Sequence, residues 1–208
     1  NLVASELDRQ SRRNNIVNAA YSALLKHGLP TLSYDRIAEE GGLSRQLVKY
    51  HFPNSEDLML ALCDHIALMY RKTLVTLVRE AEGKDRINIF FDFYFDLLEG
   101  SPKPRDDQIY DALLSLSTAS PDIRDKLGSQ YTLLKDVVSQ ELQVSYPGLP
   151  IQACENLGYW FVCLMYGHWK MVASLGFQEG QKFVARDAID RLLTSYVEKV
   201  EDHAQINR

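Results

Sequence analysis

The feature that most constrains how this chain can fold is a stretch near its start, LSYDRIAEEGGLSRQLVKYHF, from Leu32 to Phe52. The spacing of its apolar residues predicts two short helices, over about residues 33–40 and 44–50. Gly41 and Gly42 end the first helix, and Gly42 supplies the left-handed backbone that a tight turn between helices needs. The stretch therefore predicts a helix-turn-helix, an arrangement used by many DNA-binding proteins.

The two faces of the second short helix differ in chemistry. The inward side chains are expected to be Leu43, Leu47 or Val48, and Phe52, which pack against Ile16, Ala20 and Ile37. The outer face is left with Arg45, Gln46, Lys49 and Tyr50, and His51 follows them. Hydrogen-bond donors and cations of this kind suit the major groove of DNA and its flanking phosphates. A helical hairpin that only packs would not need so many donors on one short exposed face.

Helical periodicity continues through almost the whole chain, and the alternating β-branched runs typical of strands are essentially absent. Glycine and proline divide the sequence into about nine helices. One of these is expected to run from Asp85 to Glu99 through the aromatic run FFDFYF. We therefore expect an all-α protein. Residues 1–55 would form a three-helix DNA-binding domain, and residues 56–208 a larger helical domain for effector binding and dimerisation.

The distribution of charge and the cysteine content indicate what the protein binds and in which compartment it works. Residues 1–55 hold seven Lys and Arg against five Asp and Glu, whereas the net charge of the whole chain is -5. A mildly basic N-terminal segment (residues 1–55, the head) on an acidic remainder of the chain (the body) suits a protein that presents one end to phosphates. The cysteines, Cys63, Cys154 and Cys163, lack the spacing of a disulfide framework, which favours a reducing compartment.

No stretch of the chain is expected to enter a membrane. No secretory signal precedes the first polar helix. The run from Leu157 to Gly167 lacks charged and amide side chains, but it is too short to span a bilayer. We expect a cytoplasmic protein with no membrane partner.

The segment from Arg12 to Leu62 resembles the N-terminal domain of the TetR family of bacterial transcriptional regulators. The shared features are Ala19, Ala20 and Gly28 in the first helix, Ile37 and Ala38, the run from Gly42 to Ser44, and YHFPNSEDL from Tyr50 to Leu58. The resemblance implies that Ser33 and Tyr34 touch the DNA backbone, that Tyr50 and His51 hold phosphates, and that the major groove takes Ser44, Arg45, Gln46, Leu47 and Lys49.

Two positions depart from the family pattern. The family usually has an aromatic residue where Lys49 stands, so Lys49 is expected to contact guanine or an additional phosphate. A lysine is usual near Ser55, and its absence removes one expected phosphate contact. We expect these changes to alter operator preference without abolishing binding to double-stranded DNA.

The resemblance also implies a homodimer formed through the last two helices. The first of these, from Pro150 to Leu175, is apolar around its whole circumference and must be covered on all sides. The last helix carries an apolar stripe at Ala185, Ile189, Leu192, Tyr196 and Val200. In a two-fold symmetric dimer, the DNA-binding domains of the two subunits would contact the two halves of a palindromic DNA site.

A cavity for a small-molecule effector is the third implication of the resemblance. The candidate lining residues form an aromatic-rich set that suits an apolar or planar ligand. They are Phe91, Tyr94, Phe95, Tyr131, Trp160, Met165, Tyr166 and Trp169. The alternative is that these side chains, and His168 beside them, form ordinary core.

Motifs of catalysis and metal binding are missing from the sequence. Cys163 and His168 are five residues apart, which puts them on different sides of a helix. There is no His-Glu-x-x-His, P-loop, Gly-rich dinucleotide turn or nucleophile elbow. We expect no enzyme, no metal site and no cofactor. The predicted function is a transcriptional repressor that an effector releases from DNA, and the alternative is a helical protein-interaction module without specific DNA binding.

Overall fold

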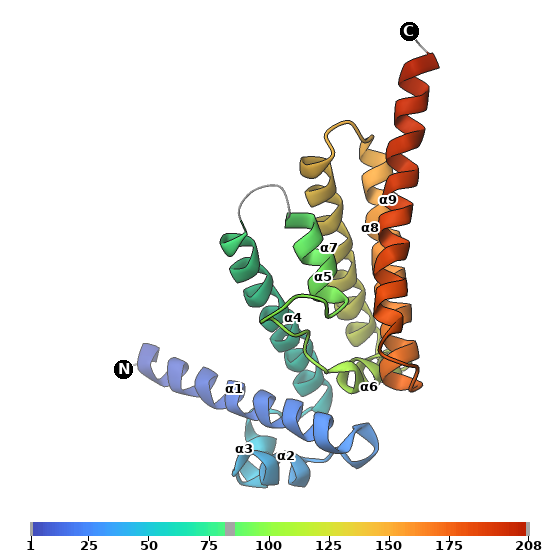
Figure 1. Cartoon of the computed structure of the whole chain (residues 1–208). Helices are drawn as coiled ribbons and strands as arrows, with labels where there is room; N and C mark the ends of the chain where they lie inside the picture. The colour runs from blue at the N-terminus through green and yellow to red at the C-terminus, as the bar shows by residue number, and fades with distance from the viewer. Residues whose placement is uncertain (1, 82–85, 207–208) are drawn as a thin grey trace. The chain divides into compact units, whose positions relative to one another are not determined.

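A computed structural model describes residues 2–81 and 86–206. All the α-helices labelled in Figure 1 lie within these two ranges. The elements are α1 (Leu2–His27), a 3-10 turn (Leu29–Thr31), α2 (Tyr34–Gly41), α3 (Arg45–His51), α4 (Ser55–Glu80), α5 (Arg86–Tyr94), α6 (Asp107–Ser117), α7 (Pro121–Ser145), α8 (Ile151–Trp169), a π-helical turn (Lys170–Ser174) and α9 (Gln181–Ile206). The described part of the chain contains no strand, so the predicted all-α fold with about nine helices is confirmed.

The chain divides into two compact units. Unit 1 comprises Asn1–Tyr70 and Asp106–Gly128, and unit 2 comprises Arg71–Arg105 and Ser129–Arg208. The chain therefore passes between the units three times, and both α4 and α7 contribute to each unit. The expected boundary after residue 55 does not coincide with the division by contacts, and as a division by function it stays a prediction.

The core of unit 1 joins α1 to the two short helices. Ile16 and Ala20 of α1 are fully buried, and Ile37 of α2 is 2% exposed. Val48 and Phe52 are completely buried, whereas Leu47 is only half-buried. Of the two candidates for the inward position on α3, Val48 is therefore the core residue.

α5 is shorter than the sequence pattern predicts, because it ends at Tyr94 and not at Glu99. Asp96 has a φ of 57°, a left-handed conformation that cannot continue a right-handed helix. Its carboxylate accepts hydrogen bonds from the backbone N–H of Lys103 at 2.8 Å and from Arg105 at 2.9 Å. The prediction of a helix to Glu99 is wrong because these later residues hold Asp96 in a turn.

The described helices do not meet the requirements for crossing a bilayer. Across residues 2–81 and 86–206, none combines the length and the apolar character that crossing a membrane demands.

Candidate functional site

Both short helices of the head begin at a serine that caps them. Ser33 Oγ accepts a hydrogen bond from the backbone N–H of Arg36, and Ser44 Oγ accepts one from that of Leu47, each at 3.1 Å. These contacts satisfy N–H groups that a helix start leaves without an intrahelical partner. Ser33 and Ser44 therefore already have a structural role in the free protein, and both remain exposed.

The turn between α2 and α3 depends on two glycines for different reasons. Gly42 has φ 61° and ψ 35°, the left-handed conformation expected from the sequence. Gly41 lies close to α1, since a Cβ atom added there would be 2.9 Å from the Cβ of Ala19. Together they allow α2 to end against α1 and the chain to turn sharply into α3.

The turn and the caps leave one face of α3 open to solvent. Arg45, Gln46 and Lys49 are exposed, and Tyr50 is 76% exposed. Arg45 Nη1 lies 3.6 Å from Asp35 Oδ2, and because both side chains are mostly exposed this pair is weak. Four of the predicted DNA contacts thus share a surface rich in donors and cations.

Three other predicted contacts are placed differently. The hydroxyl of Tyr34 donates a hydrogen bond of 2.6 Å to the carbonyl oxygen of Phe52. Leu47 is half-buried. His51 is only 7% exposed, and its ring packs edge to face with that of Tyr50, with centroids 5.1 Å apart. Burial, followed by the charge of Arg13, lowers the pKa of His51, which favours the neutral imidazole.

In unit 2, three of the eight predicted effector-binding residues gather around a side chain that was not predicted, Phe161. Its ring centroid lies 5.2 Å from that of Phe91, 5.7 Å from that of Tyr94 and 6.0 Å from that of Phe95. All four rings are buried. Phe161 belongs to a helix that is apolar on every side, so no periodic signal distinguishes it from its neighbours in the sequence.

The remaining members of the predicted set fall into three groups. Met165 and Trp169 are buried. Tyr131 and Tyr166 are half-buried and pack edge to face, with ring centroids 6.0 Å apart. Trp160 is 46% exposed and therefore lies outside the buried aromatic cluster.

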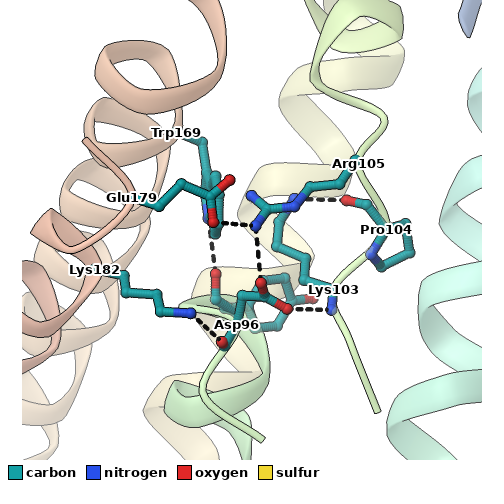
Figure 2. A network of polar contacts seen from close by, with 8 residues as sticks. Asp96, Lys103, Pro104, Arg105, Trp169, Glu179 and Lys182 are labelled. Atoms are coloured by element: carbon teal, nitrogen blue, oxygen red, sulfur yellow. Dashed lines mark hydrogen bonds and ion pairs between the residues drawn. The ribbon is translucent and has the colours of Figure 1, made fainter. Parts of the chain in front are cut away.

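A polar network surrounds Asp96 where α5 ends (Figure 2). Arg105 Nη2 lies 2.9 Å from both Asp96 Oδ2 and Glu179 Oε2. Lys182 Nζ donates to the carbonyl oxygen of Asp96 at 3.1 Å. The network connects the segment after α5 with the turn that precedes α9 and with the first turn of α9.

Trp169 lies inside the same network. Its indole N–H donates to the carbonyl oxygen of Tyr94 at 2.8 Å (Figure 2). Lys103 Nζ is 4.6 Å and Arg105 Cζ is 4.7 Å from its ring centroid, distances typical of cation–π contacts. The ring of His168 packs on Trp169, and burial together with the nearby Arg105 and Lys103 lowers its pKa.

The described part of the chain lacks a cluster of metal-ligating side chains. Between residues 2 and 206, apart from 82–85, no three His, Cys, Asp or Glu side chains are arranged to hold an ion.

Comparison with known proteins identifies the fold. No protein-family model matches the sequence, and no curated protein matches it. Solved structures do match: a TetR transcription regulator from Haloarcula marismortui superposes with a TM-score of 0.75 at 18% identity, covering 90% of this chain and 98% of that one. The chain has the fold of the TetR family.

Two further solved structures also superpose on the chain. A proposed transcriptional regulator from Saccharomonospora viridis, in complex with choline, has a TM-score of 0.73 at 18% identity, over 89% of this chain and 96% of that one. NalD, the secondary repressor of the MexAB-OprM multidrug efflux pump in Pseudomonas aeruginosa, has a TM-score of 0.60 at 16% identity, over 88% and 96%.

Proposed function

We propose that this protein is a transcriptional repressor that binds a palindromic operator as a homodimer and is released by a small-molecule effector. The observation that carries the proposal is the exposed face of α3. Val48 and Phe52 fix the inner side of the helix in the core, while Arg45, Gln46 and Lys49 are directed to solvent. A short capped helix that presents donors and cations after a tight turn suits insertion into the major groove. No catalytic step is assigned to the protein.

Selection of bound sequences from a random pool of double-stranded DNA tests DNA recognition directly. We expect a palindromic consensus whose half-sites are about one helical turn apart. In fluorescence anisotropy, Gln46→Ala and Lys49→Ala should each relax the preference at one base position or reduce affinity by about 1–3 kcal/mol. Tyr50→Ala should weaken binding to all sequences alike. If all three variants bind the selected DNA like the parent, the site assignment is wrong.

A protein-interaction module without specific DNA binding is the competing function. The two are separated by the salt dependence of DNA affinity, because contacts with phosphates release counterions and give a negative slope of log K against log salt. A DNA-binding head should show a slope of several units. An interaction module should show neither that slope nor a selected consensus.

The dimer is proposed to form through α8 and α9. Of the expected apolar stripe on α9, Ile189 is 2% exposed and belongs to the core of its own chain. Other large apolar side chains on α8, in the segment after it and at the start of α9 are left exposed. They are Tyr159, Trp160, Met171, Leu175, Phe177, Phe183 and Val184. Exposed apolar side chains in such number support an interface with a second copy.

Sedimentation equilibrium measures the assembly directly. We expect the parent to be a dimer and Phe183→Asp to shift it toward the monomer, since a buried unpaired carboxylate is costly. Val144→Asp on α7 is the matched control, because Val144 is also exposed, at 72%, but lies outside α8 and α9. A monomeric parent, or a Phe183→Asp variant that dimerises like the parent, would contradict this interface.

The effector is proposed to bind among the aromatic side chains around Phe161. An effector that prefers the conformation with lower operator affinity weakens DNA binding by the ratio of its affinities for the two conformations. A thermal-shift screen of planar and apolar compounds should yield ligands that raise the melting temperature and lower operator affinity. Phe161→Leu should reduce that shift. Ligands that stabilise the protein without changing operator affinity would count against release by an effector.

A further inference from the structure

The C-terminal end of α3 is held by side chains from both of the preceding helices. Arg13 Nη1, from α1, donates a hydrogen bond of 2.6 Å to the carbonyl oxygen of His51, the last residue of α3. Tyr34 Oη, from α2, donates one of 2.6 Å to the carbonyl oxygen of Phe52. The last carbonyl groups of a helix lack intrahelical partners, so these two donors fill a requirement that the helix cannot meet by itself.

The guanidinium of Arg13 makes a second contact that fixes its position. Its Cζ atom lies 4.1 Å from the ring centroid of Phe52, which is completely buried. Arg13 itself is half-buried. The planar guanidinium of an arginine is well suited to lie on an aromatic ring, and a positive charge at a helix C-terminus is favourable. Arg13 is therefore engaged with the end of α3 and is not an extended surface cation.

A helix as short as α3 does not hold its own conformation or direction in water. α3 has seven residues, and at its C-terminal end Lys49 and Tyr50 directly precede the two anchored carbonyls. Base contacts need side chains placed within about 0.5 Å, which requires a rigid supporting shell. Movement of this end of α3 would displace Lys49 and Tyr50 first.

We infer that Arg13 and Tyr34 are positioning residues for DNA recognition, which act by fixing the C-terminal end of α3. The inference rests on the proposed function and changes the role of Tyr34, which the family resemblance assigned to the DNA backbone. Its hydroxyl is 2.6 Å from one protein carbonyl and 3.4 Å from the next, that of Pro53. Specificity thus depends on two side chains that need not touch DNA.

The test compares specific with non-specific DNA binding in Arg13→Lys and Tyr34→Phe, with folding verified by circular dichroism. Arg13→Lys keeps the charge and loses the planar guanidinium. Both variants should bind the selected operator about 3- to 10-fold more weakly, the range expected for one lost hydrogen bond, with non-specific affinity and salt slope unchanged. Arg12→Lys is the matched control, since Arg12 is exposed on the same helix and its guanidinium pairs with Asp8 at 3.1 Å.

A phosphate contact by Arg13 would give a different pattern. Arg13→Gln would then reduce the magnitude of the salt slope by about 0.9 and weaken non-specific binding, while Arg13→Lys would keep the parent's ratio of specific to non-specific affinity. Either result overturns the positioning role of Arg13. A Tyr34→Phe variant that weakens specific and non-specific binding equally overturns the role of Tyr34.

Hydrogen exchange separates failure of this inference from failure of the proposed function. If the parent selects no DNA sequence, the proposed function fails, but the anchoring of α3 can still be measured. We expect the backbone amides of α3 to exchange about 3- to 10-fold faster in both variants, with those of α4 unchanged. Exchange at the parent's rate throughout α3 would overturn the anchoring itself.

Discussion

The hydroxyl of Tyr70 donates a hydrogen bond of 2.9 Å to Asp106 Oδ1, and the chain leaves unit 1 at the first of these residues and returns at the second. Asp106 is completely buried, and Tyr70 is 8% exposed. Residues 71–105 belong to unit 2. Tyr70 and Asp106, which flank the segment 71–105, are therefore joined inside unit 1 by one buried hydrogen bond.

Removing this hydrogen bond should destabilise unit 1. In Tyr70→Phe a buried carboxylate loses a donor while the ring is kept, so the free energy of unfolding should fall by about 1–3 kcal/mol in urea titrations. Tyr50→Phe removes a hydroxyl from a side chain that is 76% exposed and should leave stability unchanged. A Tyr70→Phe variant as stable as the parent would show that the bond contributes nothing.

Two glycines inside helices should respond to alanine in opposite directions. A Cβ atom at Gly158 would be 2.7 Å from the backbone oxygen of Lys135, so Gly158→Ala must push α8 and α7 apart. We expect a loss of about 1–3 kcal/mol, as for other overpacked core positions. At Gly128 a Cβ atom meets nothing within 4 Å, and Gly128→Ala should stabilise α7 by about 0.5–1 kcal/mol. Thermal unfolding of both variants tests the pair, and the same sign for both would refute the steric argument.

Stability should fall in mildly acidic solution because of His168. Burial, and then the charges of Arg105, Lys103 and Lys182, lower its pKa below 6.5, while Glu179 acts in the opposite direction. The unfolded chain therefore takes up a proton as the pH falls below about 6.5, before the folded chain does, and unfolding is favoured.

The contribution of His168 has a slope of at most about 1.4 kcal/mol per pH unit. Urea unfolding between about pH 7 and pH 5 measures it. His168→Gln should reduce the slope of this pH dependence, to which the lowered pKa of His51 also contributes, whereas the control His27→Gln replaces an exposed histidine and should retain the full slope. Equal slopes in the parent and in His168→Gln would assign the effect to other groups.

Substitutions at Asp96 should separate two contributions to stability, the hydrogen bonds of its carboxylate and the strain of its backbone conformation. Asp96→Ala loses the acceptors for Lys103 and Arg105 and places a less tolerant residue at φ 57°, so we expect a loss of about 2–4 kcal/mol. Asp96→Gly loses the same acceptors without backbone strain and should be about 1 kcal/mol more stable than Asp96→Ala. Chemical denaturation compares the two, and equal stability would exclude strain as a cause.

Local chemistry made much of the head predictable from sequence. The starts of the two short helices near Ser33 and Ser44 and the left-handed Gly42 depend on residues a few positions away, and the structure has them as expected. The anchoring of α3 by Arg13 was not predictable, because 38 positions separate Arg13 from His51. Only the packed fold brings them together.

The structure of the body was less predictable from sequence, because it also depends on contacts that leave no periodic pattern. α5 ends early because residues after the aromatic run hold Asp96 in a turn, a contact with no periodic signature. α8 is apolar on every side, so its pattern could not separate the buried Trp169 from the exposed Trp160. Periodicity identifies a helix, but not the neighbour that each of its sides will meet.

That difference between the two tryptophans, which are the only ones in the chain, provides two intrinsic optical probes. Trp169 is 3% exposed beside two cations, and Trp160 is 46% exposed among the side chains proposed for the dimer. Fluorescence from Trp169 should report on the environment of the effector region, and fluorescence from Trp160 on contact with a second copy. Single-tryptophan variants would thus follow ligand binding and assembly separately, without any attached label.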